Sequence, residues 1–259
     1  RQIPDLIRYP VKKRFHLVQG RDKLSFPDGH EWLEQIDAAM HREDFNYLAV
    51  SAWAGKSCRD PFIVPNGVNT HIFRPTTKLS EIGKPRFRIL VERSTDDPYK
   101  GFADAMSVVE NIKKDSPIEI ECISLQRDEI HPHPLVDRIL VGTNDTTVNA
   151  AYGTADVVLK TTWFDGFGLP HLEAMAARRA LVTTDAGGNM SFCENGKNCL
   201  ITPTRDVQAL TASVRQLLHD QPLREKLAHG GFDTAQQWSW ERSAAHLLEA
   251  FDHAPATET

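Results

Sequence analysis

The chain has few cysteines, little net charge and no long apolar stretch, and each shortage excludes a class of protein. Its net charge is only −5, from 30 Lys plus Arg against 35 Asp plus Glu, which argues against a strongly basic nucleic-acid binder. No stretch approaches the roughly 18 consecutive apolar residues that a membrane-spanning helix requires. Its four cysteines are too scattered for a disulfide framework, so we expect reduced thiols in a cytoplasmic protein: Cys58, Cys122, Cys193 and Cys199.

What the chain does contain is the composition of a globular protein and a regular alternation of strands and helices. Hydrophobic residues make up 41% and charged residues 25% of its 259 residues, enough for one large domain or two small ones. Apolar runs predict strands at 15–18, 47–51, 62–64, 86–91, 118–122, 139–142, 156–159, 181–184 and 199–201. Helical spacing predicts helices at 32–40, 102–112, 170–178, 205–219, 221–230 and 240–252. The alternation indicates an α/β fold with a parallel sheet covered on both faces.

A turn-forming stretch, Pro65-Asn66-Gly67-Val68-Asn69, divides the chain. We therefore expect a partial N-terminal domain over 1–65 and a ligand-binding domain over 66–238, with a C-terminal helix and tail over 239–259 that packs back towards the first. Ligands of parallel α/β sheets bind at the carboxyl ends of the strands. The chemistry should thus lie in the loops that follow Val91, Val141, Leu159 and Thr184.

The most informative of these loops precedes the helix at 170–178. Gly166 and Gly168 permit positive φ and close approach to a ligand, and Pro170 suits a first helical position. A helix that begins there can bind phosphate through its unpaired N–H groups. Glu173 in the first turn can accept hydrogen bonds from two vicinal hydroxyls, and Asp165 can reach a second polyol. A nucleotide-sugar has these parts; the plain alternative is an ordinary loop with two solvated carboxylates.

The stretch from Trp163 to Ala176 resembles the acidic–seven–acidic signature of retaining glycosyltransferases with the GT-B fold, family 4 (glycosyl transferases group 1). Asp165 replaces the glutamate that is usual there. Further resemblances follow in family order: 64–75, Arg93 with Lys100-Gly101, 152–157, 184–188, and Trp240-Glu241. The resemblance spans 62–252 strongly and 15–60 weakly. It implies a Rossmann-like C-terminal donor domain with a parallel sheet, and an incomplete N-terminal Rossmann-like domain.

The resemblance also implies roles. Lys100, Arg93 and Asp165 would be catalytic: the two cations would meet the diphosphate of the leaving group, and the carboxylate would contact the donor sugar. The spacing of seven between Arg93 and Lys100 is wider than usual in the family. Donor-binding residues would be Gly166, Phe167, Gly168, Leu169, Glu173, Val141 and Asn144. No metal or cofactor is implied, because the chain has no Asp-x-Asp and the basic pair can supply positive charge.

The implied activity is metal-independent transfer of a hexose, with retention, from a nucleotide diphosphate sugar to a hydroxyl of a glycan or lipid-linked acceptor. The alternative is a nucleotide-sugar-binding module without turnover, which the short N-terminal domain favours. A nicotinamide dehydrogenase is disfavoured, since no Gly-x-Gly-x-x-Gly follows a strand. The first 23 residues carry a net charge of +5, which suggests peripheral contact with an anionic inner membrane face. The basic residues of this segment are Arg1, Arg8, Lys12, Lys13, Arg14, Arg21 and Lys23.

Overall fold

A computed structural model describes residues 12–20, 24, 30, 32–76, 86–93, 97–116, 119–126 and 130–257. The chain divides into two compact units. Unit 1 comprises Arg1–Asn66 and Glu241–Thr259, and unit 2 comprises Gly67–Trp240. Since helix α9 (Trp240–His253) lies almost wholly in unit 1, the two ends of the chain fold together.

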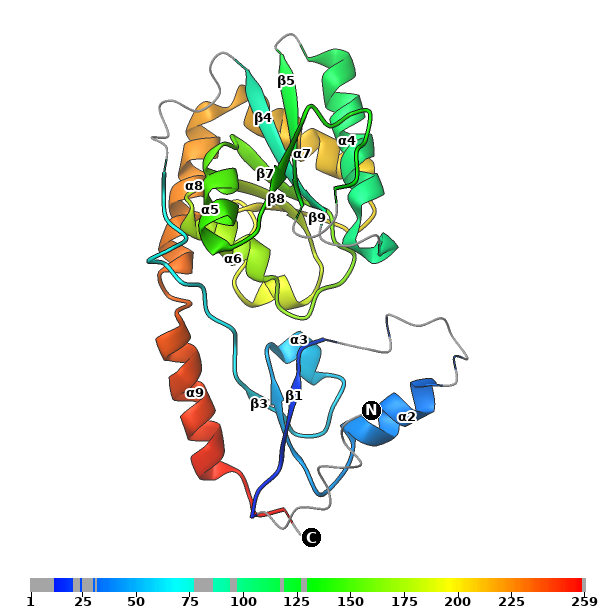
Figure 1. Cartoon of the computed structure of the whole chain (residues 1–259), viewed down its shortest axis with the longest axis vertical. Helices are drawn as coiled ribbons and strands as arrows, with labels where there is room; N and C mark the ends of the chain where they lie inside the picture. The colour runs from blue at the N-terminus through cyan, green and yellow to red at the C-terminus, as the bar shows by residue number, and fades with distance from the viewer. Residues whose placement is uncertain are drawn as a thin grey trace. The chain divides into compact units, whose positions relative to one another are not determined.

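Unit 1 is built on a three-stranded parallel sheet in the order β1-β2-β3, with bounds Phe15–Val18, Asn46–Ala49 and Phe62–Ile63. Helices α2 (Trp32–Met40), α3 (Ala52–Gly55) and α9 complete it (Figure 1). Because side chains alternate along a strand, each sheet face has its own apolar cluster. Tyr47 and Ala49 of β2 pack with Met40 of α2, and Leu48 packs with Ala250 of α9.

The basic residues of the N-terminal segment fall mostly outside the described residues. Arg1, Arg8, Arg21 and Lys23 lie there, as does part of the strand predicted from residue 118. Of the other three, Lys13 donates to the Phe251 carbonyl (2.7 Å) and Arg14 is buried. Lys12 is exposed. Two of the three described cations therefore take part in the packing of unit 1.

Unit 2 contains a six-stranded, fully parallel sheet in the order β6-β5-β4-β7-β8-β9. Its strands are β4 (Phe87–Arg93), β5 (Ile120–Gln126), β6 (Arg138–Val141), β7 (Val157–Lys160), β8 (Ala180–Thr184) and β9 (Leu200–Thr202). Its helices are α4 (Phe102–Asp115), α5 (Asp145–Gly153), α6 (Leu169–Ala176), α7 (Val207–His219) and α8 (Gln221–Ala235), with short 3-10 turns η3 (Pro98–Lys100) and η4 (Gly188–Ser191). The order reverses between β4 and β7, as in doubly wound nucleotide-binding sheets. The predicted α/β fold is confirmed.

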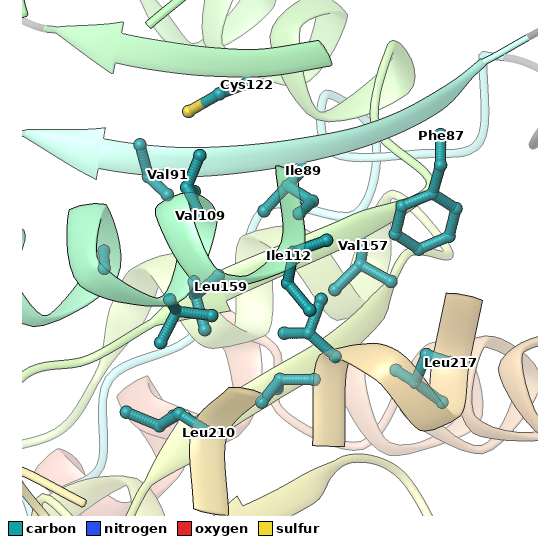
Figure 2. Close-up of a cluster of buried hydrophobic side chains, with 14 of the residues drawn as sticks. Phe87, Ile89, Val91, Val109, Ile112, Cys122, Val157, Leu159, Leu210 and Leu217 are labelled. Atoms are coloured by element: carbon teal, nitrogen blue, oxygen red, sulfur yellow. The ribbon is translucent and has the colours of Figure 1, made fainter. Parts of the chain in front are cut away.

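The main core of unit 2 lies between the sheet and helices α4 and α7 (Figure 2). Ile89 and Val91 of β4 and Leu159 of β7 are each at most 1% exposed and point towards Val109 of α4 and Leu210 of α7. Burial of one such side chain contributes about 1.5–3 kcal/mol. The same alternation sends the intervening residues of each strand to the opposite face of the sheet, which α6 covers.

The structure differs from the predicted elements mainly at their ends. Helix α8 continues to Ala235, five residues past the predicted end, and a short helix α3 forms where none was expected. Ser51 caps α3, because its side chain accepts from the Ala54 N–H (3.0 Å). In the described part of the chain, every helix is too short or too polar to cross a bilayer.

Candidate functional site

The loops that follow β4 and β7 bring two charged side chains together. Lys100 ends η3 in the β4–α4 connection, and Asp165 lies in the β7–α6 connection. The Lys100 Nζ is 4.0 Å from the Asp165 Oδ2, and both side chains are about a quarter exposed. These loops start at the two strands where the sheet order reverses, which is where ligands bind in such sheets. The structure thus brings together the predicted pair Lys100 and Asp165.

Aromatic side chains beside this ion pair hold the two loops against each other. Tyr99 stacks on Phe164 with ring centroids 4.5 Å apart and planes 13° apart. The Lys100 Nζ lies 5.1 Å from the centre of the Tyr99 ring, within cation–π range. The backbone N–H of Trp163 donates to the Tyr99 carbonyl (2.7 Å). Sequence reasoning missed this stack, because Tyr99 and Phe164 are 65 positions apart.

Close contacts at Gly188 and Gly168, which lie beside and at the end of the loop after Asp165, leave no room for a side chain at either position. The Gly188 N–H donates to the Asp165 carbonyl (2.9 Å), and a Cβ on Gly188 would overlap the carbonyl group of Gly166. Gly168 precedes α6 with φ of 94°, where a Cβ would lie 2.9 Å from the His171 Nδ1. These two glycines therefore set how closely the loop lies over the start of α6.

Two buried polar side chains lie in the first turns of α6. Glu173 is 8% exposed, and its Oε2 accepts a hydrogen bond from the Tyr152 hydroxyl (3.1 Å). His171 is fully buried, with its Nε2 2.8 Å from the Thr183 Oγ1, while its buried Nδ1 has no hydrogen-bond partner among the described residues. Burial, with the Lys160 ammonium as a second cause, lowers the pKa of His171 to about 4. His171 is therefore a neutral imidazole at pH 7.

A buried ion pair lies at the ends of the same two strands. The Lys160 Nζ of β7 donates to the Glu92 Oε2 of β4 (2.6 Å), with side chains 10% and 2% exposed. Lys160 pairs in register with Thr183, the partner of His171. Sequence reasoning missed this pair. Its signal was a charged residue at the end of each of two otherwise apolar runs, Ile89-Leu90-Val91-Glu92 and Val157-Val158-Leu159-Lys160.

Arg93 lies on the other face of the sheet, at the start of α4. Its guanidinium is 4.7 Å from the centre of the Phe102 ring and donates to the His131 carbonyl (3.3 Å). The alternation along β4 explains this, since Arg93 shares the face of Ile89 and Val91. The predicted catalytic role of Arg93 stays a prediction.

The other predicted donor-binding residues serve visible structural roles. Phe167 is buried, with its ring 5.7 Å from that of Trp238, and its backbone N–H donates to the Asp165 Oδ1 (3.3 Å). Leu169 is the first residue of α6. Val141 ends β6 and is 39% exposed, and Asn144 caps α5 by accepting from the Thr147 N–H (3.0 Å). Their contacts with a donor stay predictions.

Across the described ranges, no group of three or more His, Cys, Asp and Glu side chains is arranged to hold a metal ion. Two ion pairs lie at or beside the two loops. These are the partly exposed pair of Lys100 with Asp165 and the buried pair of Lys160 with Glu92. The site can therefore offer an anionic ligand two ammonium groups and the N-terminus of α6.

Comparison with known proteins places this geometry in context. Residues 135–233 match the family described as Glycosyl transferases group 1. The chain is 27% identical over 210 residues to the MMP alpha-(1->4)-mannosyltransferase of Mycolicibacterium hassiacum, which covers 75% of this chain and 48% of that protein. The chain thus spans about half the length of this relative.

Two solved structures share the fold. Sucrose-phosphate synthase from Thermosynechococcus elongatus superposes with a TM-score of 0.77 at 18% identity, over 96% of this chain and 69% of that one. HepE of Anabaena, in complex with UDP and glucose, superposes with a TM-score of 0.75 at 16% identity, over 93% and 72%. The chain therefore has the GT-B fold, and over residues 135–233 it contains a match to the glycosyl transferases group 1 family.

Proposed function

We propose that this chain binds a nucleotide diphosphate sugar and transfers its hexose, with retention of configuration, to a hydroxyl of a glycan or lipid-linked acceptor. The observation that carries the proposal is the meeting of Lys100 and Asp165 over the reversal point of the sheet, beside the N-terminus of α6. The group 1 match over 135–233 and the mannosyltransferase relative support it, as does the nucleotide-bound HepE neighbour.

Each part of the site has a task in this reaction. The Leu169 N–H at the start of α6 and the Lys100 ammonium take the diphosphate, because a helix N-terminus and a cation both stabilise negative charge. Pro170 has no N–H, and the His171 N–H donates to the Gly168 carbonyl (3.0 Å). Glu173 accepts from the ribose hydroxyls, and Asp165 contacts the donor sugar. As the glycosidic bond breaks, negative charge grows on the leaving diphosphate, and Lys100 meets that charge. The cation thereby supplies what a metal ion supplies in metal-dependent transferases.

The alternative is a module that binds nucleotide-sugars without turnover. A donor-hydrolysis assay separates the two, since an enzyme releases nucleoside diphosphate from UDP-glucose, UDP-galactose, GDP-mannose or another donor of a panel. We expect wild-type protein to release it at a rate that EDTA does not change. Binding of a donor without release would favour the module. Loss of activity in EDTA that magnesium or manganese restores would contradict the metal-free mechanism.

Lys100→Ala tests the role of the cation in the transition state. Because the charge that Lys100 meets grows during bond breakage, we expect a larger loss of kcat than of donor affinity. Lys113→Ala is a matched control: this lysine of α4 pairs with Asp137 (2.6 Å), away from the two loops, and we expect unchanged kinetics. Equal losses in affinity and kcat for Lys100→Ala would mean that the cation only anchors the ground state.

A further inference from the structure

The buried pair of Glu92 and Lys160 lies where a ligand of this sheet binds. Glu92 is on β4 and Lys160 on β7, the two strands between which the strand order reverses. Each residue comes at or next to the carboxyl end of its strand, just before the loop that carries Lys100 or Asp165. Crevices at such reversal points are where doubly wound sheets hold their ligands.

The side chains of Glu92 and Lys160 also lie on the face of the sheet that α6 covers. Val91 and Leu159 point into the core with α4 and α7 (Figure 2), so the next residues along β4 and β7, Glu92 and Lys160, point to the opposite face. That face is covered by α6, because His171 of α6 contacts Thr183, the register partner of Lys160. The Lys160 ammonium therefore lies beneath the start of α6.

A buried ion pair is a costly way to fill this position. Two charges lose their hydration, and an apolar pair of similar volume often gives equal or greater stability. Both members are buried, with 2% of the Glu92 side chain and 10% of the Lys160 side chain exposed. A charged pair at this position therefore calls for a role other than packing, and its place next to the two loops indicates one in ligand binding.

We propose that Lys160, positioned by Glu92, is a second cation of the nucleotide-sugar site that acts with Lys100 on the diphosphate. This inference rests on the proposed function and deepens it. It adds Lys160 to the cations predicted for the diphosphate; of these, Arg93 has its guanidinium 4.7 Å from the centre of the Phe102 ring. Glu92 is a positioning residue, because it acts through Lys160.

Substitution of the two members of the pair should affect UDP binding differently if the inference is right. Lys160→Met removes a charged hydrogen bond to the diphosphate and should weaken UDP binding by about 10- to 100-fold. Glu92→Gln keeps an oxygen that accepts from the Lys160 Nζ but removes the compensating charge, so UDP should bind at least as tightly as to wild type. A pair that serves packing alone predicts similar losses for both variants.

Isothermal titration of the full chain with UDP and with GDP tests this, with unfolding temperatures measured in parallel. Lys113→Met is the matched control and should bind like wild type. If Lys160→Met does not fold, Glu92→Leu/Lys160→Met replaces the pair by an apolar one and should fold, yet bind UDP as weakly as expected for Lys160→Met. Wild-type affinity for UDP in a folded Lys160→Met or in Glu92→Leu/Lys160→Met would overturn the inference. A loss of UDP affinity in Glu92→Gln as large as that in Lys160→Met would also overturn it. A wild-type chain that binds neither nucleotide would instead contradict the proposed function.

Discussion

His171 should make the stability of unit 2 sensitive to acid. The imidazole is fully buried and its pKa falls from the ordinary 6.5 to about 4, first through burial and then through the nearby Lys160 ammonium. The Asp165 and Glu92 carboxylates oppose this fall without cancelling it. As the pH falls, His171 thus takes up a proton near pH 6.5 in the unfolded chain but only near pH 4 in the folded chain. Acid therefore favours unfolding.

The size of the effect follows from this difference in pKa. At 1.36 kcal/mol per unit of pKa, His171 contributes about 3 kcal/mol of stability that is present above pH 6.5 and is lost as the pH falls towards 4. His171→Gln removes the titrating group and keeps a polar amide at this position. Between pH 6.5 and 4 we therefore expect the free energy of unfolding of His171→Gln to fall by about 3 kcal/mol less than that of wild type.

Urea unfolding between pH 7.5 and 4 measures the pH dependence of the free energy of unfolding. Monitoring it through hydrogen exchange of the Leu181 and Val182 amides in β8 restricts the measurement to unit 2. His229, which is on the surface of α8, offers a matched control, and His229→Gln should follow the wild-type curve. Parallel curves for wild type and His171→Gln would refute the reasoning, because they would mean that His171 takes up its proton equally in both states.

Two further substitutions test the glycine loop and the first turn of α6. Gly188→Ala places a methyl group on the Gly166 carbonyl, so we expect a loss of about 1–3 kcal/mol in stability together with weaker UDP binding, whereas Gly196→Ala, whose Cβ meets nothing within 4 Å, should alter stability alone. Equal UDP affinity in the two variants would contradict this. Glu173→Ala should lose about 1.5–3 kcal/mol of UDP affinity per charged hydrogen bond to the ribose, while Tyr152→Phe, which keeps the carboxylate, should stay within a few-fold of wild type. Calorimetry that finds unchanged affinity in Glu173→Ala would exclude the ribose role.

Local pattern was enough to predict the α/β architecture of unit 2, and it marked the loop before α6 as the candidate site. Alternating strands and helices indicate a parallel sheet, because parallel neighbours need a long crossover connection, which is usually a helix. Gly166, Gly168 and Pro170 mark a loop that leads into a helix, since glycine permits backbone conformations that other residues avoid and proline is common at the start of a helix. Such conformational preferences act within a few residues, so the sequence alone is enough to predict them.

Only the tertiary structure decided which side chains meet. Tyr99 reaches Phe164, and Glu92 reaches Lys160, because β4 and β7 become neighbours when the sheet order reverses between them. The alternation along β4 then sends Arg93 to the α4 face and Glu92 to the α6 face. Glu92 and Arg93, which are adjacent in the sequence, therefore contact different side chains. The spacing between Arg93 and Lys100 does not say on which face of the sheet each side chain lies.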